Sequence, residues 1–243
     1  MSKSNTFDKN KIKAILFNPE RVLNISPTGH WFIAPNFFKY INKNNFNSKE
    51  KYQRNLSFPK CVDPESNESL IIYEKENFEQ FNYYYKILLE NFPQLEIKFE
   101  KIDSINVDYV YNHYKFFNDT FKLFPELSKN YHPESNSNNC TSLKNIFKKI
   151  SFKNCFKILN TSSQKNINNI NTFHISSIDE YSLSPNEAIF VDDNIKNCDA
   201  AKKLGITSFL LCEDYKSYIY NKIKHREYNI IRSLSDIKSI LAK

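Results

Sequence analysis

The sequence predicts an α/β fold in which a parallel sheet forms a core and a helical domain is inserted after the first strand. Two short apolar runs, Ala14–Phe17 and residues 188–191, end abruptly in polar residues, as is typical of strands buried on both faces of a parallel sheet. Between them, residues 26–139 carry aromatic and aliphatic side chains at helical spacing. At 243 residues the chain is long enough to bury a core and to carry an insertion.

The composition is that of a globular protein, with 40% hydrophobic and 25% charged residues. The formal net charge of +7 comes without a recognised nucleic-acid-binding motif, so a nucleic-acid partner is not favoured. The five cysteines form no C-x-x-C pair, which indicates reduced thiols and neither a disulfide framework nor a zinc site. Because no apolar run approaches the length needed to cross a membrane, we expect a cytoplasmic protein without a membrane partner.

The first apolar run stops at Asn18 and Pro19. Proline has no N–H group and cannot continue a central strand, so the chain is expected to leave the sheet here. Ligands of open α/β sheets bind just beyond the carboxyl ends of the strands. Asn18 and Glu20 therefore occupy the position at which such a fold carries out its chemistry.

Residues 26–139 are expected to form an all-helical insertion. Apolar residues recur there at intervals of three and four positions in two stretches, first Phe78, Phe81, Tyr85 and Leu88, then Val107, Val110, Tyr114 and Phe117. The polar stretch at residues 132–139 is interpreted as the linker that returns the chain to the core.

A second core strand is expected at residues 156–159, and Thr161 and Ser162 follow it. Either hydroxyl could bind an anion at the end of this strand. Both could instead cap the next helix, as serine and threonine commonly do.

Residues 184–211 give the most specific pattern in the chain. The apolar run ends in Asp192 and Asp193, a helix with apolar residues on one side follows, Gly205 is expected at its C′ position, and a strand begins at Thr207. The two acids could also act only as caps of the helix. A short strand and a last helix are expected within residues 229–241.

Two of these segments resemble motifs of the haloacid dehalogenase (HAD) superfamily, whose members are mostly Mg²⁺-dependent phosphohydrolases. Residues 14–24 resemble the first motif, in which the strand ends in Asp-x-Asp-Gly. Residues 184–211 resemble the fourth motif and its helix, in particular those of the phosphatase and nucleotidase branches. The resemblance implies a Rossmann-like three-layer core formed by residues 1–25 and 140–243, with residues 26–139 as a helical cap that covers the active site.

In that family the first aspartate of the first motif attacks phosphorus, and the second is a general acid/base. The resemblance places Asn18 at the nucleophile position and Glu20 at the acid/base position. The family also has a glycine after the second aspartate and a phosphate-binding hydroxyl, and these positions fall on Arg21 and on Thr161 or Ser162. It further has a catalytic lysine, for which this segment offers Lys165 without the usual following proline, so we favour a vacant lysine position.

The resemblance also implies a Mg²⁺ site. Its ligands would be the amide oxygen of Asn18, the backbone carbonyl of Glu20 and a carboxylate of Asp192 or Asp193. Because an amide stands in place of a carboxylate, one negative charge is missing. We therefore expect Mg²⁺ to bind more weakly than in the family.

A neutral amide is a far poorer nucleophile than a carboxylate, and Pro19 has no N–H with which to promote deamidation of Asn18. We therefore favour a pseudophosphatase that binds a small phosphorylated or anionic ligand or a protein partner. The alternative is an active Mg²⁺-dependent phosphatase or nucleotidase with rearranged catalytic residues, which Asp192, Asp193 and Thr161 would support. A third hypothesis, nucleic-acid binding by the basic surface, predicts an affinity that falls steeply with salt.

Overall fold

The computed structural model describes two sets of residues. It describes residues 7–19, 21–28, 33, 35–41, 44, 82, 85–86, 88–90, 101, 114–133, 178–179 and 181–242 in full, and residues 134–137 and 157–161 by their backbone. The chain divides into two compact units, one formed by Met1–Ile25 and Phe116–Lys243 and the other by Ser26–Lys115.

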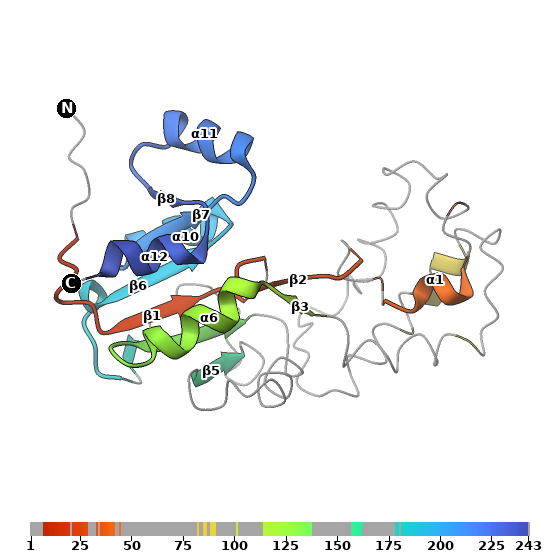
Figure 1. Ribbon diagram of the computed structural model, residues 1–243, viewed down its shortest axis with the longest axis horizontal. Helices are drawn as coiled ribbons and strands as arrows, with labels where there is room; N and C mark the ends of the chain where they lie inside the picture. The colour runs from red at the N-terminus through yellow and green to blue at the C-terminus, as the bar shows by residue number, and fades with distance from the viewer. Residues whose placement is uncertain are drawn as a thin grey trace. The chain divides into compact units, whose positions relative to one another are not determined.

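The first unit is built on a six-stranded sheet with the order β5-β4-β1-β6-β7-β8 (Figure 1). All five neighbouring pairs of strands are parallel. The strands are β1 (Ala14–Phe17), β4 (His132–Ser137), β5 (Lys157–Thr161), β6 (Ala188–Asp192), β7 (Thr207–Leu211) and β8 (Asn229–Ile231). The predicted α/β fold with a parallel sheet is therefore confirmed.

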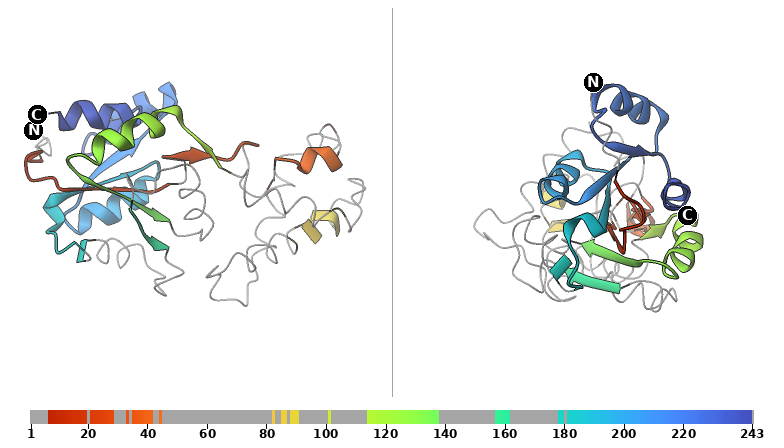
Figure 2. Two further views of the ribbon diagram at one scale, coloured as in Figure 1. Left: turned by 60° about the horizontal axis from the view of Figure 1, so that its bottom comes forward. Right: turned by 90° about the vertical axis from the view of Figure 1, so that its left-hand side faces the viewer.

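Helices cover both faces of this sheet. In Figure 2, α6 (Asn118–Leu127) and α12 (Leu234–Leu241) lie on one face and α10 (Ile195–Lys203) lies on the other. Every residue of β1 and β6 is buried, which explains why both strands are apolar along their whole length and show no alternation. The three layers of the predicted core are present.

Local capping explains where α10 begins and ends. The side chain of Asn194 accepts a hydrogen bond from the Lys196 N–H at the first turn. At the other end the Gly205 N–H donates to the Lys202 carbonyl and the Ile206 N–H donates to the Ala201 carbonyl, which is a Schellman motif. Gly205 has a φ of +85°, so the prediction that it is the C′ residue is confirmed.

Replacing Gly205 by alanine is expected to lower the free energy of unfolding by roughly 1–2 kcal/mol, the penalty for an L-residue in the left-handed region. An added Cβ would meet the Pro185 Cβ at 3.5 Å, an ordinary contact, so the penalty is conformational. Urea unfolding measures it. Lys203→Ala, at an exposed position of the same helix, is the control and should change stability little. Equal losses in both variants would contradict the assignment.

The return of the chain to the core differs from the prediction. The prediction that residues 132–139 form a linker is wrong for residues 132–137, because β4 lies within the sheet between β1 and β5. The His132 N–H donates to the Lys13 carbonyl at 2.8 Å, and this pairing with the segment before β1 sets the register. The polar strand carries no apolar pattern, so periodicity did not reveal it. Phe116 and the residues after it accordingly belong to the same compact unit as the core sheet, whereas the sequence placed the return at residue 140.

The second unit is described only in part. It contains α1 (Phe37–Tyr40), and residues 82, 85–86 and 88–90 are helical. The rings of Phe37 and Tyr85 stack with centroids 5.6 Å apart. The predicted helix through Tyr114 and Phe117 is not formed there, because β3 (Lys115–Phe116) pairs with β2 (Asn24–Ile25). That this unit is an all-helical cap stays a prediction.

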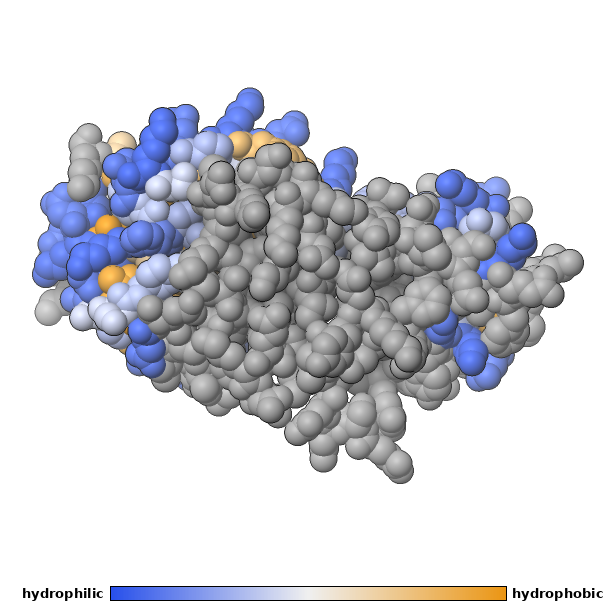
Figure 3. Space-filling view, turned by 90° about the horizontal axis from the view of Figure 1, so that it is seen from below, coloured by the Kyte–Doolittle hydropathy of each residue, from blue (hydrophilic) through white to orange (hydrophobic). Residues whose placement is uncertain are grey.

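Figure 3 shows one face of the molecule. On the face drawn in Figure 3 the described residues are mainly hydrophilic, and apolar atoms form small separate patches. Among the described helices, none has both the length and the hydrophobicity needed to cross a membrane. The cytoplasmic location stays a prediction.

Candidate functional site

The candidate site lies where β1 and β6 end side by side. Phe17 is paired with Val191, and the Asn18 N–H donates to the Val191 carbonyl at 3.0 Å. β1 has β4 on one side and β6 on the other, so the strand order runs outward from β1 in both directions. Such a switch point is where open α/β sheets bind ligands.

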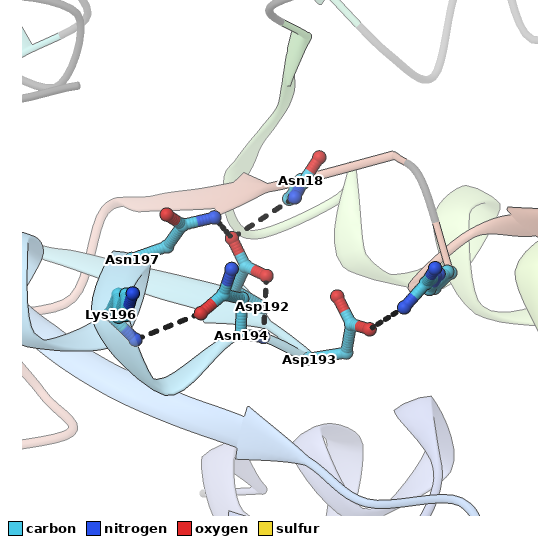
Figure 4. Close-up of polar contacts among 7 residues, drawn as sticks. Asn18, Asp192, Asp193, Asn194, Lys196 and Asn197 are labelled. Carbon is cyan, nitrogen blue, oxygen red and sulfur yellow. Dashed lines mark hydrogen bonds and ion pairs between the residues drawn. The ribbon is translucent and has the colours of Figure 1, made fainter. Parts of the chain in front are cut away.

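The Asp192 carboxylate is the centre of the site and is completely buried. Its Oδ2 accepts hydrogen bonds from the side-chain amides of Asn18 at 3.1 Å and Asn197 at 2.8 Å (Figure 4). Its Oδ1 accepts a hydrogen bond from the Asn194 backbone N–H at 2.8 Å. Because an ionised carboxylate only accepts, the amide of Asn18 turns its nitrogen, and not its oxygen, towards Asp192.

Burial, together with the nearby charge of Asp193, raises the pKa of Asp192 to about 7. The three N–H donors stabilise the charged form and oppose this shift. The ionised form of Asp192 is therefore disfavoured by burial and stabilised by hydrogen bonds from N–H groups.

Asp193 points away from Asp192 (Figure 4). Its Oδ2 lies 3.7 Å from a guanidinium nitrogen of Arg21, whose side chain is 65% exposed. Arg21 has a φ of 60°, which is uncommon for a residue with a side chain. The tight turn there is closed by hydrogen bonds from the Leu23 and Asn24 N–H groups to the Pro19 carbonyl.

The remaining predicted site residues are only partly placed. Thr161 ends β5, at the same edge of the sheet as Asn18 but two strands away from β1. Glu20, Ser162 and Lys165 lie outside the described residues. Their roles stay predictions.

The strand beside β1 is β4, whose residues the sequence interpretation assigned to a linker. By register Ser135 is level with Phe17, and Ser137 is level with Thr161. Ser135 and Ser137 are thus the hydroxyl residues that the sheet places nearest in register to Asn18. Their place could not be found from periodicity, because β4 is polar throughout.

A Mg²⁺ ion requires several oxygen ligands, and the described side chains at this edge do not present a converging set of free oxygens. Both oxygens of Asp192 accept protein hydrogen bonds, Asn18 presents N–H groups, and Asp193 faces Arg21. Within the described part of the chain, no group of three His, Cys, Asp or Glu residues could hold a metal. A cation would have to displace the Asn18 amide from Asp192.

Comparisons with known proteins bear on the fold. No family model and no curated protein matches the sequence. Solved structures do match, among them an L-2-haloacid dehalogenase from Xanthobacter autotrophicus with chloropropionic acid covalently bound, at 13% identity and a TM-score of 0.63 over 95% of this chain and 98% of that one.

Two further matches are HAD-family proteins. A HAD phosphatase from Thermococcus onnurineus is 15% identical, with a TM-score of 0.58 over 95% of this chain and 98% of its own. The magnesium complex of a HAD-family enzyme from Bacteroides thetaiotaomicron is 17% identical, with a TM-score of 0.52 over 82% and 93% of the two chains. Because these identities are low, the matches establish the fold alone. The chain has a HAD-like fold, as its first and fourth motifs predict.

Proposed function

We propose that this protein is a pseudophosphatase: a HAD-fold protein that binds a phosphorylated or otherwise anionic ligand, or a protein partner, without transferring a phosphoryl group. The observation that carries the proposal is the hydrogen bond from the Asn18 amide to Asp192 at 3.1 Å. This contact lies at the positions where the family resemblance implies a nucleophile and a metal ligand. Here the Asn18 amide donates a hydrogen bond to the Asp192 carboxylate.

The chemistry of the two side chains supports the absence of turnover. An amide oxygen is neutral and poorly nucleophilic, and loss of a catalytic nucleophile costs on the order of 10⁶ in rate. Asp192 is directed at N–H donors, so it is not free to bind a cation without breaking them. We propose that Mg²⁺ binding is weakened accordingly.

Two residues make this edge of the sheet less negative than the family pattern implies, although Asp192 and Asp193 remain there. Compared with the Asp-x-Asp-Gly pattern, asparagine at 18 removes a negative charge and arginine at 21 adds a positive charge. The Arg21 guanidinium is exposed, and its ion-pair partner among the described residues is Asp193, in a partly solvated contact that is worth little in water. It can turn to a phosphate without a large loss, and it offers two parallel N–H donors.

We expect Arg21→Gln to weaken binding of inorganic phosphate at least about tenfold, because a charge-assisted contact is lost. Isothermal titration in the presence of EDTA measures this. Arg226→Gln removes an exposed arginine outside the site and is the matched control. If both variants bind phosphate as the wild type does, Arg21 is not the receptor. If the wild type binds no anion, the anionic ligand is excluded and the protein partner is the part of the proposal that remains.

The alternative is an active phosphatase or nucleotidase with rearranged catalytic residues. It is supported by the retained Asp192 and Asp193 and by the hydroxyl residues at the ends of β4 and β5. The similar structures include dehalogenases as well as phosphatases, so the fold does not decide the reaction. Turnover by the wild type, tested at the end of the Discussion, separates the two hypotheses.

A further inference from the structure

The candidate site carries more acidic than basic side chains. Among the described residues, Arg21 is the basic residue that pairs with one of its acids, and its guanidinium lies 3.7 Å from the Asp193 carboxylate (Figure 4). Asp192 lies at the end of β6, and Glu213 follows β7, the next strand of the sheet. An anionic ligand at this edge therefore meets acids as well as the arginine.

Glu213 leaves the sheet at the edge where the candidate site lies. Asp192 is level with Leu210 of β7, and the two strands are parallel, so the residues that follow them come out side by side. Neighbouring strands are about 4.8 Å apart. The Cys212 N–H still donates to the Ile231 carbonyl at 2.9 Å, which fixes the backbone immediately before Glu213.

The carboxylate of Glu213 forms no ion pair within the part of the chain that the structure describes. The side chain as a whole is exposed. Burial of its carboxyl group, followed by the negative charge of Asp193, raises the pKa of Glu213. The two acids thus influence each other across the ends of β6 and β7, and of the two it is Asp193 that pairs with the arginine.

Binding of a phosphate to Arg21 changes this balance of charge. The guanidinium can leave Asp193 without a large loss, because their contact is partly solvated. Asp193 and Glu213 are then two uncompensated carboxylates beside a bound anion, and like charges at short range repel. A ligand that brings a positive charge of its own relieves this repulsion.

We propose that the ligand of this site is a phosphate monoester that also carries an amine, with its phosphate on Arg21 and its ammonium group between the carboxylates of Asp193 and Glu213. This proposal rests on the anionic ligand proposed above and names its chemical class. An ammonium group has three N–H donors, so it can reach both carboxylates, and such charge-assisted hydrogen bonds are stronger than neutral ones. The ligand replaces the positive charge that Arg21 withdraws from Asp193.

Isothermal titration in EDTA with matched probes tests this class of ligand. The probes are a series of aminoalkyl phosphates of increasing chain length and the alkyl phosphates of the same lengths, so the two members of each pair differ in the ammonium group. The best aminoalkyl phosphate should bind to the wild type at least about tenfold more tightly than its alkyl counterpart, because hydrogen bonds to charged groups are gained.

Substitutions of Glu213 test where the ammonium group binds. Glu213→Gln should lower the preference for the amine and raise the affinity for the alkyl phosphate, because a repelling charge is removed. Glu213→Lys should invert the preference, because the protein then supplies the positive charge. Glu227→Gln removes an exposed carboxylate outside the site and is the matched control, which should keep the wild-type preference. Circular dichroism confirms that each variant is folded.

Three results would overturn the proposal, and they differ from failure of the proposed function. Equal affinities within every pair of probes would exclude the amine and leave the anionic ligand standing. An unchanged preference in Glu213→Gln would show that the ammonium group does not contact Glu213. Binding of alkyl phosphates that requires Mg²⁺ and is lost in Glu213→Gln would assign the carboxylates to a metal ion. A wild type that binds none of the probes, with or without Mg²⁺, would instead remove the proposed anion site itself.

Discussion

Asn18→Asp is expected to destabilise the protein by several kcal/mol in EDTA and to regain that loss in millimolar Mg²⁺. Without a metal, the substitution replaces an N–H donor by a carboxylate oxygen 3.1 Å from the buried Asp192 carboxylate. Breaking a buried charged contact in this way typically costs about 3–5 kcal/mol. With Mg²⁺, the two carboxylates become ligands of one cation, and binding to the folded state alone restores stability.

Thermal unfolding with EDTA and with Mg²⁺ measures this response. The matched control is Asn18→Leu, which removes the same hydrogen bond without adding a charge. It should be destabilised under both conditions, without rescue by Mg²⁺. The explanation fails if Asn18→Asp is as stable as the wild type in EDTA, because the amide would then have no part in holding the Asp192 charge.

The second large effect is a fall in stability between pH 5 and pH 8. The pKa of Asp192 is about 7 in the folded protein against an ordinary value of 3.8, so between these values the folded state binds more protons than the unfolded state. Stability therefore decreases as pH rises through this window and levels off above the folded pKa. At about 1.4 kcal/mol per pKa unit, the contribution is a few kcal/mol.

Urea unfolding in EDTA at pH 5 and pH 8 tests this slope. Asp192→Asn keeps the shape of the side chain and has no charge to desolvate, so most of the difference between the two pH values should disappear. The salt-bridged acids Glu126 and Glu187 do not confuse the comparison, because their lowered pKa values put their titration below this window. An unchanged slope in Asp192→Asn would show that another group, such as a histidine, is responsible.

The sequence was informative where residues were constrained on all sides. β1 and β6 are buried on both faces, so their apolar runs could be recognised directly. The end of α10 depends on a left-handed residue, and Gly205 is one of only two glycines in the chain. Asn18 follows β1 and Asp192 ends β6. Because parallel strands end at the same edge of a sheet, the sequence could place these two residues together.

The parts of the fold that could not be predicted depend on strand pairing, which the hydrophobic pattern of the sequence does not show. β4 is polar and contains Pro133, so it resembled a linker, although its backbone pairs with β1 and β5. As a result the strand that lies between those of Asn18 and Thr161 was missed. The ion pair of Arg21 with Asp193 could not be foreseen either, because it depends on where two side chains lie, although the glycine position implied at Arg21 agrees with its positive φ.

Hydrolysis of an aryl phosphate and a panel of nucleotides with Mg²⁺, by purified wild type, Asn18→Asp and Asp193→Asn, tests the central claim most directly. A pseudophosphatase predicts that the wild type is silent and that Asn18→Asp gains turnover, because the substitution restores both the nucleophile and a carboxylate ligand for Mg²⁺. Turnover by the wild type that Asp193→Asn abolishes would contradict the claim, and a different residue would then have to be the nucleophile.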